Sequence, residues 1–296
     1  MIVIKTITEI GNYLGKQKTA IKQNPIKVAL IPTMGALHDG HLSLIKAAQD
    51  FADIIVVSIF VNKTQFNDLN DYQKYPKQYD SDLEKLKSCK VDVVFLPEDV
   101  EIFNELPSFK IVPTQLADCL CGATRPGHFE GVALIVTKLF NIIKPDFAIF
   151  GEKDFQQLQI IKTLVSDLNF SVKIVAQKTA RQTDGLALSS RNQRLNDTGK
   201  VQAALLYKTL NKIAQAVKES SLNLTEISAL LAQQKKDLLQ LGFEKIDYLE
   251  IRDEQNLQLL DNTNTHKPMR IFIAAYLQTV RLIDNIPVTL LQSFNN

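Results

Sequence analysis

Five short apolar runs, rich in β-branched residues, divide the first 176 residues of the chain. They occupy residues 26–31, 54–61, 91–96, 146–150 and 172–176. Polar and apolar positions do not alternate within them, so both faces of each strand should be buried, as in a parallel sheet. Helical patterns lie between these runs, at residues 41–52, 79–89, 129–143 and 155–168. This succession predicts an α/β fold with a doubly wound, Rossmann-like parallel sheet.

The pattern changes after a polar stretch at 177–190. Residues 198–240 predict two helices joined near 219–224. The segments that follow, at 244–252, 269–277 and 280–288, alternate more and have no helices between them, which favours an antiparallel sheet. We therefore expect a Rossmann-like ligand-binding domain at 1–176. A smaller α+β C-terminal domain should occupy 177–296.

Composition narrows the class of protein. The chain has 296 residues and a net charge of +2, which argues against a general nucleic-acid surface. Its three cysteines are too few and too poorly spaced for a disulfide framework. No apolar run approaches the roughly 18 residues of a membrane span, and no signal peptide is visible. These features predict a cytoplasmic protein that acts on neither nucleic acid nor membrane.

Two of the four histidines, His38 and His41, lie three residues apart in the turn after the first apolar run. A zinc site would need further ligands, and the neighbouring sequence supplies none. A pair of structural histidines is a second interpretation. A phosphate site is the third, because Gly35 and Gly40 permit tight turns and a helix N-terminus attracts anions. Imidazole N–H groups placed there can stabilise charge that develops on an α-phosphate.

Polar residues also follow the second apolar run and precede the helix at 129–143. Asn62 and Gln65 lie where a doubly wound sheet binds its ligand, and their amides can donate to and accept from a small polyhydroxy acid. Loop capping is the alternative. Arg125 and His128 are candidates of the same kind, although they also fit an ordinary charged helix start.

A further set follows the run at 146–150. Gly151 allows a nucleotide sugar to come close, and Lys153 is a point charge suited to phosphates. Asp154 can accept from ribose hydroxyls or cap the helix, and Gln157 lies one turn into that helix. The alternative is a capped helix with a solvent-facing lysine.

Hydroxyl and charged groups gather at two more places. Ser189, Ser190 and Arg191 offer two hydroxyls and a guanidinium fork for the β- and γ-phosphates, or they belong to a plain linker. Asp80 and Asp82 could lie near pyrophosphate, but the first turn of a helix is the interpretation we favour.

The H-x-G-H turn resembles the signature of the nucleotidyltransferase superfamily that includes class I aminoacyl-tRNA synthetases. The longer stretch "IPTMGALHDGHLSLI", followed in order by 56–68, 150–161 and 181–195, is similar to the pantothenate synthetase (pantoate–β-alanine ligase) family. The similarity spans nearly the whole chain. It implies an ATP-dependent condensation of pantoate with β-alanine through pantoyl adenylate, which releases AMP and pyrophosphate. The product, pantothenate, is a precursor of coenzyme A.

The resemblance also implies three overlapping sets of site residues. The catalytic set is His38, His41, Lys153, Ser189, Ser190 and Arg191. The ATP-binding set is Met34, His38, His41, Gly151, Lys153, Asp154, Ala180, Leu188, Ser189, Ser190 and Arg191. The pantoate-binding set is Pro32, Met34, Asn62, Gln65, Arg125, His128 and Gln157.

The chain departs from the family pattern in two loops. The family usually has proline where Lys63 stands, proline near Lys178, and an aromatic residue in place of Arg194, so the stiffness of these loops should differ. Mg²⁺ is implied because a triphosphate must be neutralised for in-line attack, although the sequence identifies no ligands for it. The resemblance further implies a homodimer formed through the N-terminal domain.

Other functions fit parts of this pattern. A nucleotidyltransferase with a different acceptor would share the histidine turn, and pantoate-dependent exchange of pyrophosphate with ATP would separate the two. A catalytically silent nucleotide-binding regulator would bind ATP and release no AMP. An aminoacyl-tRNA synthetase is disfavoured, because no anticodon-binding region or strongly basic face is visible.

Overall fold

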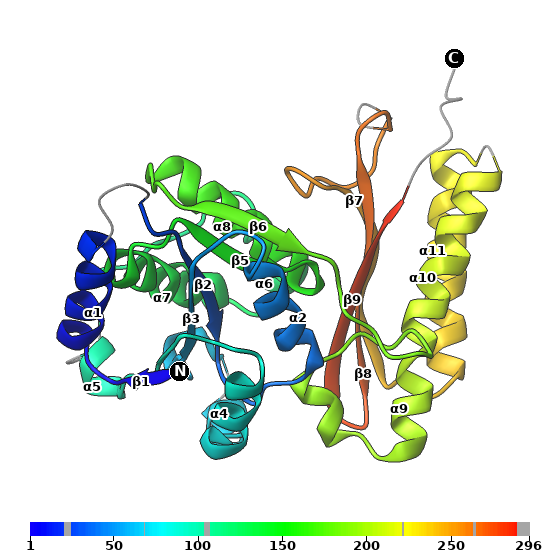
Figure 1. Cartoon of the computed structure of the whole chain (residues 1–296). Coiled ribbons are helices and arrows are strands. Elements are labelled where there is room, and N and C mark those ends of the chain that lie inside the picture. The colour runs from blue at the N-terminus through cyan, green and yellow to red at the C-terminus, as the bar shows by residue number, and fades with distance from the viewer. Residues whose placement is uncertain (21–24, 68, 104–106, 221, 263–264, 289–296) are drawn as a thin grey trace. The chain divides into compact units, whose positions relative to one another are not determined.

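The computed structural model of the chain describes residues 1–20, 25–67, 69–103, 107–220, 222–262 and 265–288. It divides into two compact units (Figure 1). The first unit comprises Met1–Thr114, Arg125–Glu152 and Ile160–Lys178, and the second comprises Gln115–Thr124, Lys153–Gln159 and Thr179–Asn296.

The first unit contains a six-stranded sheet in the order β1-β4-β3-β2-β5-β6, with every neighbouring pair parallel. Its strands are β1 (Ile2–Ile4), β2 (Val28–Thr33), β3 (Ile54–Ile59), β4 (Val93–Phe95), β5 (Phe147–Gly151) and β6 (Lys173–Gln177). The predicted parallel sheet is confirmed, and each of the five apolar runs forms a strand. The sixth strand, β1, was not predicted, because three residues are too few to show a period.

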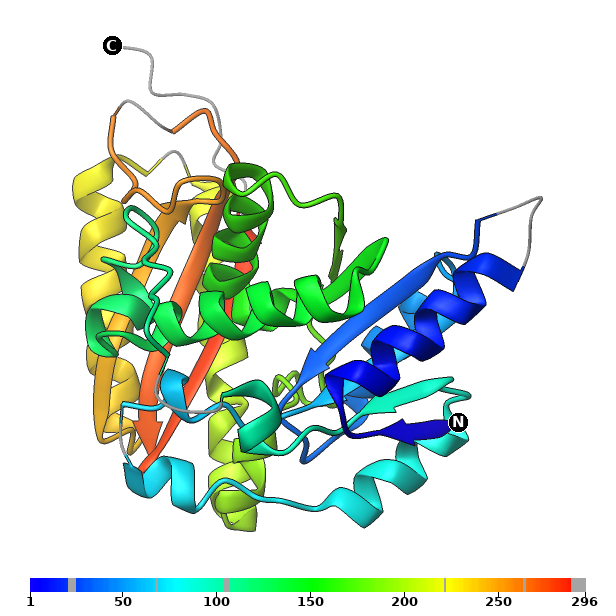
Figure 2. The same cartoon turned by 90° about the vertical axis from the view of Figure 1, so that its left-hand side faces the viewer.

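Helices cover both faces of this sheet. The longer ones are α1 (Ile7–Ala20), α2 (Asp39–Ala48), α4 (Tyr79–Ser88), α7 (His128–Ile143) and α8 (Phe155–Asp167). The short ones are α3 (Leu69–Gln73) and α5 (Asp99–Ile102), with the 3₁₀ turns η1 (Lys63–Gln65) and η2 (Glu152–Asp154). Helix α2 packs on β2, β3 and β5, whereas α7 packs on β2 and on α1. Right-handed crossovers place α1 and α2 on opposite faces (Figure 2, with α1 in dark blue before the strands).

Strand β2 is the point where the winding of the sheet changes direction. The chain passes from β2 to β3 and β4 on one side, and from β5 to β6 on the other. Ligands of doubly wound folds bind beyond the carboxyl ends of the strands at such a switch point. The loop that follows β2 and the end of β5 are therefore the places to look for a site.

The second unit is built on an antiparallel sheet in the order β7-β8-β9. Its strands are β7 (Lys245–Asp253), β8 (Met269–Leu277) and β9 (Val280–Val288), and its helices and turns are α6 (Leu120–Thr124), η3 (Ser190–Arg194), α9 (Asp197–Ala203), α10 (Leu205–Glu219) and α11 (Leu224–Gln240). Helices α10 and α11 lie along one face of this sheet and enclose an apolar core with it (Figure 1). The predicted α+β character of the C-terminal part is confirmed.

The expectation of two helices at 198–240 is wrong, because three form there. Helices α9 and α10 meet at Ala204, whose φ of −63° and ψ of −17° are still helical. A break that keeps helical dihedrals leaves the apolar period almost unchanged, so the sequence does not reveal it.

Two short segments, 115–124 and 153–159, belong to the second unit rather than to the sheet that precedes them in sequence. The buried Gln156 joins them: its Nε2 donates to the carbonyls of Leu116 at 2.7 Å and Cys119 at 2.9 Å, and its Oε1 accepts from the N–H of Cys121 at 2.9 Å. Among the helices of the described ranges, none is long and apolar enough to cross a membrane.

Candidate active site

The two histidines of the H-x-G-H turn cap helix α2. The sequence predicted that this helix begins near His41, but it begins at Asp39 with His38 as its N-cap. The Nδ1 atom of His38 accepts from the N–H of Gly40 at 3.1 Å, and Nδ1 of His41 lies 3.4 Å from the N–H of His38. This is a reciprocal capping box built from two imidazoles, whose ring centroids are 4.1 Å apart.

These cap bonds assign the tautomer of both rings. A neutral imidazole whose Nδ1 accepts a hydrogen bond carries its proton on Nε2. His38 and His41 can therefore each donate an Nε2–H at the positive end of α2, where an anion is favoured. Among the residues that the structure describes, no group of three or more histidine, cysteine, aspartate or glutamate side chains could hold a metal ion.

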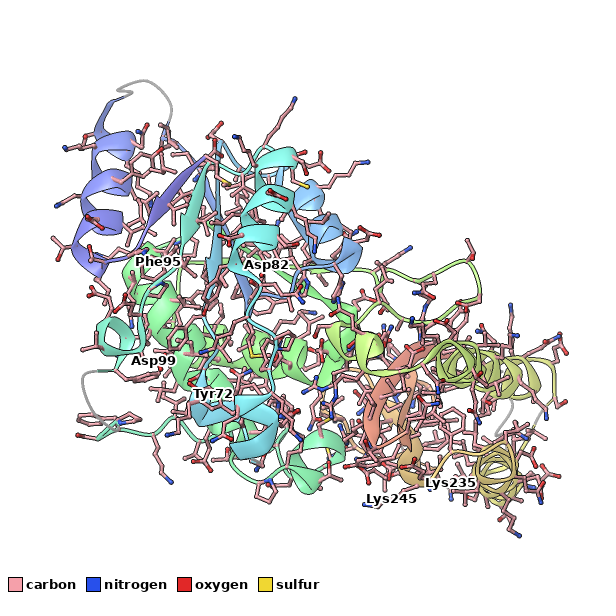
Figure 3. All side chains as sticks on the ribbon, turned by 90° about the horizontal axis from the view of Figure 1, so that it is seen from below. Tyr72, Asp82, Phe95, Asp99, Lys235 and Lys245 are labelled. Carbon is pink, nitrogen blue, oxygen red and sulfur yellow. The ribbon has the colours of Figure 1, made fainter. Side chains whose placement is uncertain are left out.

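Helix α4 fixes the turn before His38. Asp82 is fully buried, and its carboxylate accepts from the N–H groups of Ala36 at 2.8 Å and Leu37 at 2.7 Å (Figure 3 labels Asp82 on α4). One turn along, Lys85 Nζ donates to the carbonyl of Leu37 at 2.8 Å. Asp82 does lie in the first turn of its helix, as favoured from the sequence. Its contact with the histidine turn was missed, because no local pattern links positions 46 residues apart.

Helix α2 also reaches the end of β5. A Cβ atom added to Gly151 would meet Leu44 of α2 at 3.8 Å. The two carboxyl-end segments expected to receive the nucleotide, at β2 and β5, are thus neighbours in the same unit. Pro32 lies on β2, beside β3, and Met34 follows the end of β2.

The amide residues after β3 form a connected group. Asn62 is buried and caps the 3₁₀ turn η1, with its Oδ1 accepting from the hydroxyl of Thr64 at 2.8 Å. Its Nδ2 donates to Gln65 Oε1 and to the carbonyl of Gly131, each at 3.0 Å. Gln65 Nε2 lies 2.9 Å from the thioether of Met34. The structure therefore brings together three members of the predicted pantoate set, and the Asn62 cap holds the turn in which Lys63 replaces proline.

Arg125 and His128 contact the main chain of the same turn at Gln65. His128 Nδ1 lies 2.7 Å from the carbonyl oxygen of Gln65, and its Nε2 lies 3.1 Å from a guanidinium nitrogen of Arg125. Because guanidinium groups only donate, Nε2 of His128 accepts and Nδ1 carries the proton that is given to Gln65. These contacts position the backbone of Gln65.

Gly131 in α7 allows the helix and the turn η1 to approach each other closely. Replacing Gly131 by alanine would drive the new Cβ into the backbone of Thr64 and displace Gln65. We expect a loss of about 1–3 kcal/mol in unfolding free energy and a raised KM for pantoate. Thermal unfolding and steady-state kinetics measure both effects.

Gly15, inside α1, supplies the matched control. A Cβ there meets nothing within 4 Å, so Gly15→Ala should stabilise the protein by up to about 1 kcal/mol. If Gly131→Ala had the same unfolding free energy and the same KM for pantoate as Gly15→Ala, the close contact between Gly131 and η1 would be contradicted.

The second unit contains the charged residues that follow β5. Lys153 lies in η2 with its side chain 17% exposed, and its Nζ is 3.9 Å from the half-exposed carboxylate of Asp154. Gln157 is partly exposed in the first turn of α8, whereas its neighbour Gln156 is buried and structural. The sequence did not indicate the role of Gln156, since its carbonyl partners lie 37 to 40 residues away.

The serine-arginine motif follows a small hairpin in the same unit. Leu188 N–H donates to the carbonyl of Ala180 at 3.0 Å, and the bend is made by Gly185 with φ +96° against the ring of Tyr207. Ser189 caps η3 by accepting from the N–H of Arg191 at 3.3 Å. A hydroxyl that accepts keeps its own proton for donation, so Ser189 can still bind a phosphate oxygen.

Burial shifts the pKa of a thiol and of a phenol in this unit. Burial raises the pKa of the Cys119 thiol, with Arg252 opposing the effect. Burial also raises the pKa of Tyr248 well above its usual range, and Cys121, whose Sγ lies 3.2 Å from the hydroxyl, adds to it. Cys119 and Tyr248 are therefore neutral near pH 7 and unsuited to act as nucleophiles.

Comparison with known proteins decides the family. A family model described as pantoate-beta-alanine ligase matches residues 2–287. The chain belongs to the pantoate-β-alanine ligase family. A pantothenate synthetase of Psychrobacter sp. (strain PRwf-1) is 44% identical over 261 residues, covering 88% of this chain and 91% of the relative. One of Thermosipho africanus is 42% identical and covers 97% of this chain and 99% of its own length.

Solved structures of the pantoate-β-alanine ligase family share the fold. Pantothenate synthetase from Thermus thermophilus matches with a TM-score of 0.84 at 33% identity, covering 97% of this chain and 99% of that one. The ligase from Francisella tularensis, complexed with "Beta-gamma ATP" and β-alanine, matches with a TM-score of 0.80 at 39% identity and covers 97% of both chains.

Proposed function

We propose that this ligase joins pantoate to β-alanine in two steps. The pantoate carboxylate attacks the α-phosphorus of ATP, an acyl–phosphate bond forms, and pyrophosphate leaves. The amine of β-alanine then attacks the activated acyl carbon, loses a proton, and displaces AMP. The observation that carries this proposal is the pair of Nε2–H donors at the N-terminus of α2, beside the switch point of a chain that matches the family over residues 2–287.

The residues of the site have separate tasks in this scheme. His38 and His41 donate to the α-phosphate oxygens as charge develops there, which lowers the barrier to attack. Lys153, Ser189, Ser190 and Arg191 neutralise and orient the phosphates. Met34, Gly151, Asp154, Ala180 and Leu188 complete the ATP contacts. Catalysis rests on positioning and charge neutralisation, and no protein nucleophile takes part.

Pantoate is bound by the amide group after β3 and by Gln157. Gln65 presents its amide beside Met34 and is held by the buried Asn62, and Pro32 lies near the end of β2. Arg125 and His128 act through the backbone of Gln65. This arrangement provides donors and acceptors for the hydroxyl and carboxylate groups of a small hydroxy acid.

Magnesium is proposed only as part of the substrate. The described residues contain no group of three or more acidic, histidine or cysteine side chains that could hold a metal ion. Mg²⁺ typically binds through substrate phosphates and one or two carboxylates. We also propose a homodimer, which a sedimentation mass tests.

The function is tested by AMP release with each substrate omitted in turn. AMP should appear only when ATP, pantoate and β-alanine are all present in multiple turnover. Pyrophosphate exchange with ATP should require pantoate but not β-alanine. Exchange without pantoate would favour a nucleotidyltransferase with another acceptor, and ATP binding without AMP release would favour a silent regulator.

Replacing Gln157 by alanine should separate the two substrates of the first step. We expect KM for pantoate to rise about 10-fold, and KM for ATP to change less than about 2-fold, because one hydrogen bond to pantoate is lost. Gln159→Ala, two residues further along the same helix, is the matched control and should leave both values unchanged. Equal losses for pantoate and ATP would contradict a dedicated pantoate contact.

A further inference from the structure

Two consecutive polar residues of β9, Asp284 and Asn285, are buried, with 4% and 3% of their surface exposed. Successive side chains of a strand point to opposite faces of the sheet. Asp284 shares its face with the apolar core residues Leu282 and Ile286, whereas Asn285 points to the other face. A buried carboxylate and a buried amide at such positions need specific partners.

Asp284 holds the hairpin that leads to the serine-arginine motif. Its Oδ2 and Oδ1 accept from the two terminal nitrogens of Arg181, at 2.6 and 2.8 Å. The same guanidinium donates to the carbonyl of Gly185 at 3.0 Å and lies 3.9 Å from the centre of the Tyr207 ring. Bidentate pairs of this kind fix direction as well as distance. The turn η3, which begins at Ser190, packs against β9 itself.

Asn285 holds the main chain at Lys153. Its Nδ2 donates to the carbonyl of Lys153 at 2.9 Å, and its Oδ1 accepts from Arg270 at 2.5 Å. The guanidinium of Arg270 lies 3.8 Å from the ring centre of Phe155, two residues after Lys153. The segment at 153–155 is thus fastened to the sheet by a hydrogen bond and by stacking.

Both proposed phosphate-binding segments are therefore attached to one pair of adjacent residues. We infer that Asp284 and Asn285 are positioning residues, which set the distance and orientation of Lys153 relative to Ser190 and Arg191 so that all three meet one triphosphate. This inference rests on the phosphate role proposed for Lys153 and the serine-arginine motif. The two residues act through the segments they hold, Asp284 through Arg181 and Asn285 through the carbonyl of Lys153.

The Arg181–Asp284 ion pair and the hydrogen bond from Asn285 support a positioning role more than a purely stabilising one. A buried ion pair is weak evidence for stability, because well-packed apolar side chains of similar volume often serve as well. What Arg181 and Asp284 provide instead is a single defined geometry for a hairpin whose tip, Thr183 and Asp184, is exposed. The main-chain bond from Asn285 does the same for a 3₁₀ turn of only three residues.

A double-mutant cycle with Asn285→Ala and Lys153→Ala tests this inference. In Asn285→Ala, kcat/KM for ATP should fall about 10-fold, while KM for pantoate changes less than about 2-fold. In the Lys153→Ala background, Asn285→Ala should have little further effect, because no ammonium is left to position. Asn256→Ala makes the same side-chain change at an exposed asparagine in the turn after β7 and should leave both constants unchanged.

The results distinguish failure of the positioning role from failure of the phosphate-binding role proposed for Lys153. If Lys153→Ala leaves ATP use intact, the proposed role of Lys153 is wrong, and the inference with it. Three results would contradict only the positioning role, provided that Lys153→Ala impairs the use of ATP. They are unchanged kinetics in Asn285→Ala, an effect of Asn285→Ala that adds fully to that of Lys153→Ala, and equal losses of kcat/KM for ATP and pantoate in Asn285→Ala. Should Asn285→Ala fail to fold, a second double-mutant cycle with Asp284→Asn and Ser190→Ala tests the residue on the other face of β9. The losses in kcat/KM for ATP should then be non-additive, and additive losses would contradict the positioning role.

Discussion

Replacing His41 by alanine should lower kcat for pantothenate formation by about 10²–10³-fold, the usual cost of removing one donor to developing negative charge. The structure gives the reason, because the Nδ1 atom of His41 accepts in the α2 cap and the ring proton is therefore on Nε2, at the N-terminus of the helix. KM for β-alanine should change little, since the lost bond serves the first step. Steady-state and single-turnover kinetics measure the effect.

His266→Ala is the matched control for this variant. His266 is exposed and lies in the loop before β8, far along the chain from the histidine turn, so turnover should be unchanged. The lost cap of His41 should also cost about 1 kcal/mol in unfolding free energy, which thermal unfolding measures separately. Near-normal turnover of a folded His41→Ala enzyme would reject the assigned role.

Asp82→Asn, although a conservative change, should strongly destabilise the protein. The carboxylate accepts two buried N–H groups, and an asparagine can accept only with its one oxygen while its amide nitrogen faces the other N–H. We expect a loss of about 2–3 kcal/mol in unfolding free energy. Activity should fall as well, because the turn that carries His38 loses its anchor.

Asp80→Asn makes the same chemical change two residues earlier on the same helix. Asp80 is exposed, so stability should change by less than about 0.5 kcal/mol and turnover should not change. Denaturant unfolding and kcat of both variants test the anchor. Equal behaviour of Asp80→Asn and Asp82→Asn would show that the buried contacts of Asp82 do not position the turn.

Local sequence was sufficient to predict five of the six strands of the parallel sheet and the helices α2, α4, α7 and α8, because buried parallel strands and amphipathic helices leave periods that need no knowledge of the fold. It also pointed to His38 and His41, since a glycine-flanked turn between strand and helix has few other uses. Prediction from local sequence failed where an element was too short to show a period, or where its boundary left the period unchanged. The strand β1 has three residues, and the α9–α10 break keeps helical dihedrals.

The supporting residues of the site were missed for a related reason. Asp82 and Asn285 look like ordinary helix and strand residues in sequence, and the main-chain groups that their side chains hold lie 45 to 132 residues away. Their importance depends on which main-chain groups the fold brings against them. Charges that contact substrate stand in recognisable motifs, whereas the residues that hold those motifs are defined only by tertiary structure.

The central claim is that the pantoate carboxylate displaces pyrophosphate from the α-phosphorus of ATP. Pantoate labelled with oxygen-18 in its carboxyl group tests it most directly, with AMP and pyrophosphate analysed by mass spectrometry after complete turnover with β-alanine. The account predicts one heavy oxygen in AMP and none in pyrophosphate, because the acyl C–O bond breaks when the amide forms. Heavy oxygen in pyrophosphate, or none in AMP, would contradict it.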